Sequence, residues 1–290
     1  MFFFVENKIS DFHVSWDVIE SINKIFYCHN EKKNKEEQLL FSGSLKEERK
    51  LFFFNEKKTG HLEIKKILRE RRSVVEYEKK KMKKKDFLSV FSIFNEISSK
   101  KLFPLDELNW KPIVTFFVIY VIRVEEMESG YYIYFLDESV IEETQNFYQK
   151  KGEKFTKIDI NIPLYHIERD TNKFQMMLSS SGASCGQHRY ASFTLGMVAK
   201  LEENLLEKFG CDYYLNLHWE CGIIGQFLYI LATSIGYGAC GMGCFLETRS
   251  FKDFSLEGSP FSTFYHLSVG HSGAQYYHPY DYSSEVFTTN

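Results

Sequence analysis

Two short stretches carry residue types that could bind an anionic, planar ligand. The first is Arg71-Arg72-Ser73, whose two guanidinium groups and hydroxyl can donate hydrogen bonds to a phosphate or a ring carbonyl. The second is Gly241-Met242-Gly243, where missing side chains would let main-chain N–H and C=O groups touch a flat ligand. Each has an ordinary alternative, since a helix end at the surface often carries arginine and glycines near a strand often serve packing.

Cysteine and histidine side chains offer a second chemistry, which is metal binding. Cys240 and Cys244 are four residues apart, and the nearby histidines are His218 and His266. On a strand, residues at that spacing lie about 13 Å apart, which is too far to share one metal ion. We therefore expect no metal site. No Cys–His spacing singles out a nucleophile either, so the catalytic residues stay unassigned.

Composition predicts a globular protein with a substantial core. The 290 residues are 44% hydrophobic and 26% charged, and the net charge of −3 argues against a general nucleic-acid binder. Six scattered cysteines and the start "MFFFVENKIS", which lacks the features of a secretory signal, predict a cytoplasmic or organelle-matrix protein that is not secreted. Residues 221–246 carry no charge, but their glycines favour a buried core helix over a membrane span.

Hydrophobic patterning predicts an α+β fold, in which helices pack on an antiparallel or mixed sheet. We expect a helical arm and linker over 1–60, the main domain over 61–275 and a tail over 276–290. The charge-rich segment 78–85, which carries six lysines, is predicted to be a solvated loop.

The segments that must position the candidate residues follow from the same patterns. Helices are expected over 15–27, 61–73, 86–98 and 213–236, and strands over 112–124, 129–137, 239–245 and 262–270. Residues 190–200 are expected to form a further strand, although their periodicity is also compatible with a helix, and the polar stretch up to about 180 is expected to be helical.

In order and spacing, these segments resemble the nitroreductase superfamily. The segments that carry the resemblance are "ENKISDFHVSW", "ILRERRSVVEY", "LFPLDELNWKPIVTFFVIYVIRVEEMESGYYIY", "SCGQHRYASFTLGMVAK", "YYLNLHWECGIIGQFLYILATSIGYGACGMGCF" and "STFYHLSVG". The most specific part is the Trp-Glu-x-Gly-x-x-Gly-Gln stretch at Trp219–Gln226. The resemblance covers nearly the whole chain. It is closest to the azoline-oxidase branch and to the second half of long tandem nitroreductase-like proteins.

The resemblance implies an FMN-dependent oxidoreductase that transfers hydride to or from an unidentified substrate. Arg71, Arg72 and Ser73 would hold the polar edge and phosphate of the flavin, and Gly241, Met242 and Gly243 would lie under its ring. Members of the family place the flavin at a subunit interface, which implies a homodimer or a pair with a related nitroreductase-like chain. Additional candidate polar groups of the pocket are Gln187, His188 and Tyr190.

Three departures from the family pattern support an alternative. Val75 stands where a basic residue is usual, no lysine or arginine follows residue 252, and Lys208-Phe209 replaces a Lys-Tyr pair of the azoline oxidases. An FMN phosphate carries about two negative charges and needs charged donors. The alternative is therefore a flavin-free, inactive protein with this fold, acting as a structural subunit of a larger assembly or as the partner of a catalytic paralogue.

Overall fold

A computed structural model describes the part of the chain that includes both candidate stretches. The described residues are 67–68, 71–74, 76–99, 114–168, 190–201, 211–243, 245 and 247–273. The chain divides into two units, Met1–Phe53 and Phe54–Asn290, and all described residues belong to the second.

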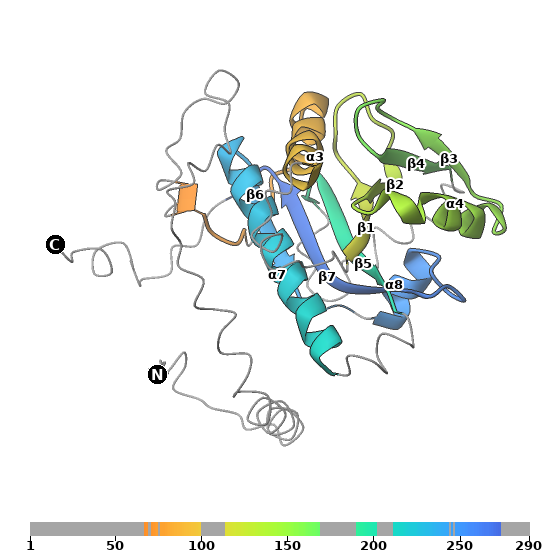
Figure 1. Ribbon diagram of the computed structural model, residues 1–290. Coiled ribbons are helices and arrows are strands. Elements are labelled where there is room, and N and C mark those ends of the chain that lie inside the picture. The colour runs from red at the N-terminus through yellow and green to blue at the C-terminus, as the bar shows by residue number, and fades with distance from the viewer. Residues whose placement is uncertain are drawn as a thin grey trace, which may run out of the picture. The chain divides into compact units, whose positions relative to one another are not determined.

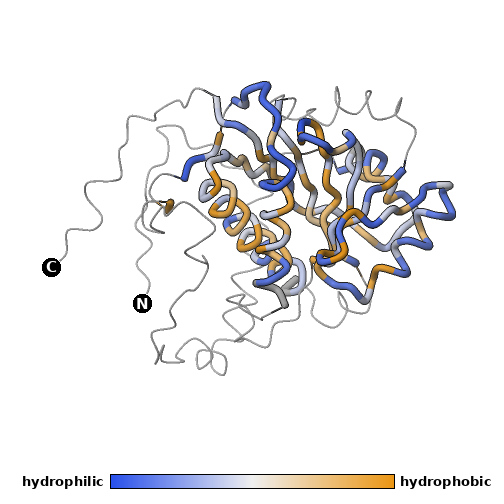
Figure 2. Tube along the Cα trace, turned by 90° about the horizontal axis from the view of Figure 1, so that it is seen from above, coloured by the Kyte–Doolittle hydropathy of each residue, from blue (hydrophilic) through white to orange (hydrophobic). Residues whose placement is uncertain are grey.

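The described residues form one seven-stranded sheet in the order β3-β4-β2-β1-β5-β7-β6, with every pair of neighbouring strands antiparallel. The strands are β1 (Val114–Val121), β2 (Gly130–Phe135), β3 (Lys154–Lys157), β4 (Leu164–Glu168), β5 (Phe193–Lys200), β6 (Gly238–Met242) and β7 (Phe261–Gly270). The strands in the middle of the sheet are largely hydrophobic, and many of the connecting loops are hydrophilic (Figure 2).

Helices cover both faces of this sheet (Figure 1). The helices α3 (Lys84–Ser99) and α7 (Cys211–Ser234) pack on one face. On the other face lie α4 (Ile141–Gln149), preceded by the short 3-10 helix η3 (Glu138–Val140), and α8 (Glu247–Asp253). A sheet covered on both sides has central strands without a polar face, which explains the nearly continuous apolar run of β1.

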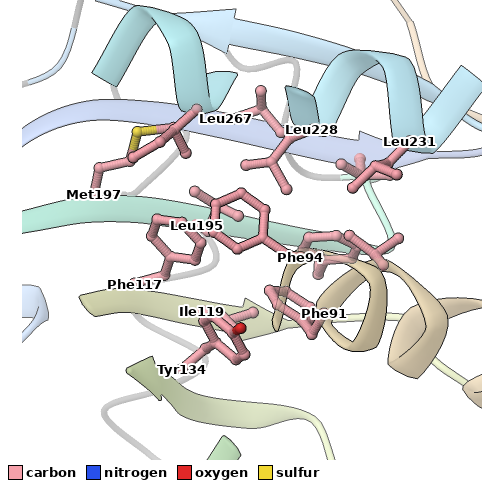
Figure 3. Packing of buried hydrophobic residues seen from close by; sticks show 14 of the residues in the cluster. Phe91, Phe94, Phe117, Ile119, Tyr134, Leu195, Met197, Leu228, Leu231 and Leu267 are labelled. Carbon is pink, nitrogen blue, oxygen red and sulfur yellow. The ribbon is translucent and has the colours of Figure 1, made fainter. Parts of the chain in front are cut away.

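The main core lies between the sheet and the helices α3 and α7, and it is rich in aromatic rings (Figure 3). Phe94 of α3 packs edge-on against Phe117 of β1, with ring centroids 5.6 Å apart. Phe117 in turn stacks with Tyr134 of β2 at 5.8 Å. Leu228 and Leu231 of α7 belong to the same cluster, so this core fixes the position of α7 on the sheet.

Most of the predicted elements are confirmed, with small shifts of their ends. The helices predicted over 86–98 and 213–236 are α3 and α7, and the strands predicted over 112–124, 129–137, 239–245 and 262–270 are β1, β2, β6 and β7. The strand expected over 190–200 is β5. None of the helices in the described part of the chain is long and apolar enough to cross a membrane.

Two predictions were wrong. The helix expected over 61–73 does not continue to its predicted end, because residues 71 and 72 lie outside regular structure and Ser73 forms a β-bridge. The polar stretch after residue 137 is not helical throughout. It begins with η3 and α4, but the strands β3 and β4 follow. β3 is the edge strand of the sheet, and three of its four residues are exposed. A strand in that position lacks the alternation of buried and exposed residues that would reveal it in the sequence.

Several predictions lie outside the described residues. They concern the arm over 1–60, residues 61–66, Val75, Gln187, His188, Lys208-Phe209, Cys244 and the tail over 276–290.

Candidate functional site

The Arg71-Arg72-Ser73 stretch lies beside the edge strand β6. The backbone N–H of Val74 donates to the carbonyl of Ala239 at 2.9 Å, and Ser73 forms a parallel bridge with Ala239. Gly238 makes this approach possible, since a Cβ at that position would lie 2.1 Å from Cγ2 of Val74. The structure therefore brings together the two candidate stretches, which are about 170 residues apart in sequence.

Three of the predicted site residues surround Tyr229, a buried side chain of α7 that sequence reasoning missed. The hydroxyls of Ser73 and Tyr229 share a hydrogen bond of 2.8 Å, and the backbone N–H of Gly241 donates to the same tyrosine oxygen at 2.6 Å. The guanidinium of Arg71 lies 5.0 Å from the centre of the Tyr229 ring, within the range of a cation–π contact. We refer to Arg71, Ser73, Tyr229 and Gly241 as the Tyr229 cluster.

Arg72 and Ser73 are exposed, and Arg71 is half-buried. One guanidinium nitrogen of Arg72 donates to the backbone carbonyl of Arg71 at 2.8 Å, which holds the Arg72 side chain against the backbone of its neighbour. Two adjacent cations and a hydroxyl at the surface are a suitable donor set for a phosphate.

The flat surface expected at Gly241 is covered by a ring of the same chain. A Cβ at Gly241 would lie 2.0 Å from the hydroxyl oxygen of Tyr265, and a Cβ at Gly225 would lie 3.1 Å from an edge carbon of that ring. Gly225 belongs to α7 and Gly241 to β6, so these two glycines flank a space that the Tyr265 ring fills. We call this space the Tyr265 slot.

Met242 and Gly243 are placed differently from Gly241. Because side chains alternate along a strand, Met242 points to the opposite face of β6, where it is buried. Gly243 is exposed, and a Cβ there would meet no atom within 4 Å. Of the three residues, only Gly241 takes part in the contacts of the Tyr229 cluster.

Tyr190, the described member of the additional polar candidates, packs against the small hydrophobic cluster of Val74, Tyr77 and Ala191, and two cations lie near its ring. The Lys79 ammonium is 4.6 Å and the Arg123 guanidinium 5.3 Å from the centre of its ring. Lys79 belongs to the predicted solvated loop, and its side chain is exposed.

The sequence held only a weak signal for the two tyrosines. Tyr229 follows Gly225 by four residues, so the two positions share one side of α7. Tyr265 lies inside a strand in which no periodicity distinguishes it. Among the described residues, no group of three or more His, Cys, Asp or Glu side chains could hold a metal ion.

Tested against FMN, the site fits at one end and is closed at the other. The phosphate end has the charges and donors of Arg71, Arg72 and Ser73 at the surface. At the ring end, the N–H of Gly241 already donates to Tyr229, and the space above Gly241 holds Tyr265. A flavin ring can lie against Gly241 only after the Tyr265 side chain has moved.

Comparison with known proteins assigns the chain to a protein family. A sequence model described as "Nitroreductase family" matches residues 68–271. No protein with a curated description matches the chain.

Three solved structures illustrate the similarity. A candidate nitroreductase from Anabaena variabilis is 15% identical with a TM-score of 0.52, over 72% of this chain and 38% of that one. A candidate nitroreductase from Ralstonia eutropha is 14% identical with a TM-score of 0.46, over 75% of this chain and 87% of that one. An FMN-dependent nitroreductase from Clostridium difficile is 13% identical with a TM-score of 0.38, over 77% of this chain and 98% of that one. This chain thus spans well under half the length of the Anabaena protein, whose similarity supports a common fold.

Proposed function

Since this chain belongs to the nitroreductase family, we propose that it is an FMN-dependent oxidoreductase of the nitroreductase type. The observation that carries the proposal is the Tyr229 cluster. In it, residues predicted to bind the phosphate of a flavin (Arg71, Ser73) lie next to Gly241, which is predicted to contact the flavin ring. Family membership alone does not establish an activity, so the argument depends on these residues.

The protein's own residues would act mainly by binding and orientation. Arg71 and Arg72 would neutralise the phosphate, and the hydroxyl of Ser73 would donate to one of its oxygens. Tyr229 holds Ser73 and Gly241 at fixed separations through its two hydrogen bonds. Bound FMN would supply the hydride transfer itself.

Titration of the purified protein with FMN tests the proposal. Replacing both Arg71 and Arg72 by alanine should weaken binding at least about 100-fold, because each lost charge-assisted hydrogen bond is worth about 1.5–3 kcal/mol. The matched control is the double variant Lys154→Ala, Lys157→Ala, which removes the same charge from the opposite edge strand β3 and should bind like the wild type. If the wild-type protein shows neither quenching of FMN fluorescence nor a thermal shift, the proposal is wrong.

A second candidate function is favoured by the position of Tyr265. A chain that fills its ring space with its own tyrosine could be a flavin-free member of the family that serves as a subunit or as the partner of a catalytic paralogue. The absorbance spectrum of the purified protein distinguishes the two functions. Bound flavin gives bands at about 370 and 450 nm, and a flavin-free protein lacks them.

The exposed side of α7 supports pairing with a second copy or a related chain. Tyr214 is 46% and Trp219 57% exposed, and His218, Gly222 and Gln226 on the same helix are also exposed. Large aromatic side chains on an uncharged helix surface are typical of subunit interfaces. Light scattering at micromolar concentration should show a dimer, and Trp219→Glu should shift it to monomer. A monodisperse wild-type monomer would contradict pairing between copies.

A further inference from the structure

We propose that the Tyr265 slot is a binding site for a flat heteroaromatic ring, and that Tyr265 closes this site in the free protein. The inference deepens the proposed function, on which its choice of ligand rests. It makes the flavin ring and the Tyr265 ring competitors for one space between Gly225 and Gly241.

The first argument is the shape of the slot. Gly225 on α7 and Gly241 on β6 both lack the side chain that would collide with a ring between them. The two elements are fixed independently of Tyr265, because α7 is anchored in the main core and β6 is paired along its length with β7. The walls of the slot therefore do not depend on the ring inside it.

The second argument is how weakly the Tyr265 side chain is held. Among the described residues, its hydroxyl has no hydrogen-bond partner, and the half-buried ring packs against the edge of the main core without belonging to its buried residues. The backbone of β7 is paired on both sides, with β5 and β6. Rotation about the side-chain bonds alone would move the ring toward solvent, with no break in the sheet.

The third argument is the distance from the slot to the phosphate end. Ser73 is connected to Gly241 by only two hydrogen bonds, 2.8 Å and 2.6 Å long, which meet at the hydroxyl of Tyr229. A ligand with its ring in the slot could therefore carry its anionic group to Arg71-Arg72-Ser73. The chemical class that combines these features is a flavin mononucleotide, with a flat ring and a phosphate on a short chain.

Binding of lumiflavin, which has the flavin ring without the phosphate chain, tests the slot by itself. Tyr265→Ala should bind lumiflavin at least about tenfold more tightly than the wild type, because the ring no longer has to displace a side chain. Tyr265→Phe is the matched control and should bind like the wild type, since a phenyl ring still fills the slot. Equal affinity of Tyr265→Ala and the wild type would overturn the proposal.

Titration with FMN distinguishes failure of this inference from failure of the proposed function. If FMN binds the wild type and Tyr265→Ala equally well, the closed slot is wrong and the flavin function stands. If neither FMN nor lumiflavin binds any of these proteins, both are wrong. Tighter lumiflavin binding by Tyr265→Ala, with no FMN binding by the wild type, supports the slot and contradicts the flavin function.

A measurement on the wild-type protein covers the case in which Tyr265→Ala does not fold. Burial raises the pKa of the Tyr265 hydroxyl and should slow nitration of its ring by tetranitromethane. Saturating FMN should increase nitration of Tyr265 severalfold, as read by mass spectrometry of peptides, while the partly exposed Tyr165 of β4, near the opposite edge of the sheet, serves as internal reference. Unchanged or decreased nitration of Tyr265 on addition of FMN would overturn the proposal.

Discussion

Tyr229 reaches Gly241 from α7 and Tyr265 reaches it from β7, and the two side chains are held by different interactions. The Tyr229 hydroxyl is bonded to both Ser73 and the N–H of Gly241, and its ring is buried. The Tyr265 ring is half-buried and is held by the shape of the slot between two glycines. The Tyr229 cluster is thus a fixed part of the scaffold, whereas the Tyr265 slot has a removable occupant.

Truncation to alanine should give the largest difference between the two regions. Tyr229→Ala should lower the free energy of unfolding by about 3–5 kcal/mol, because it leaves a cavity beneath β6 and removes two hydrogen bonds. Tyr265→Ala should lower the free energy of unfolding by clearly less than Tyr229→Ala, since the Tyr265 ring is partly in contact with solvent. Urea denaturation of both variants measures the difference. A cost for Tyr265→Ala equal to or above that for Tyr229→Ala would contradict the comparison.

Filling the slot from the glycine side should have the next largest effect. Gly241→Ala should lower the free energy of unfolding by about 1–3 kcal/mol, because the new Cβ collides with the Tyr265 hydroxyl. In the background of Tyr265→Ala the same change should cost almost nothing, which a double-mutant cycle in urea would show as coupling. Gly243→Ala is the control, since a Cβ there meets no atom within 4 Å. Purely additive costs would mean that the ring does not lie where the structure has it.

Removal of one hydroxyl at a time should separate hydrogen bonding from shape. Tyr229→Phe should lower the free energy of unfolding by about 1–2 kcal/mol, because the N–H of Gly241 loses its acceptor and Ser73 loses its partner. Tyr265→Phe should change stability by less than about 0.5 kcal/mol. Thermal unfolding of the two variants provides the measurement, and a larger effect for Tyr265→Phe would reverse the comparison.

The smallest effect is expected at the surface of the Tyr229 cluster. Ser73→Ala removes one neutral hydrogen bond from an exposed residue and should cost about 0.5 kcal/mol. Its effect on FMN binding should be larger than its effect on stability, because the hydroxyl is also a predicted phosphate donor. Thermal unfolding and FMN titration of the same preparation measure the two effects. Equal FMN affinity of Ser73→Ala and the wild type would contradict the prediction.

Local patterns in the sequence determined the elements of the central domain. The apolar run 112–124 identified β1, and the uncharged stretch after Glu220 identified most of α7, because burial on both sides of a sheet or around a helix removes polar residues from the sequence. The same argument failed for β3, because an exposed edge strand keeps its polar residues and shows no apolar run in the sequence. The sequence also predicted that the backbone of Gly241-Met242-Gly243 lies against a flat ligand.

Only the tertiary structure decided which groups meet there. Ser73 and Tyr229 are 156 residues apart, and their hydrogen bond exists because β6 lies at the sheet edge with α7 across it. The flat group against Gly241 is the ring of Tyr265, because β7, which carries Tyr265, pairs with β6 in the sheet. Sequence spacing encodes which face of an element a residue occupies, but the order of strands in a sheet results from packing among distant segments, and that order set the occupant of the slot.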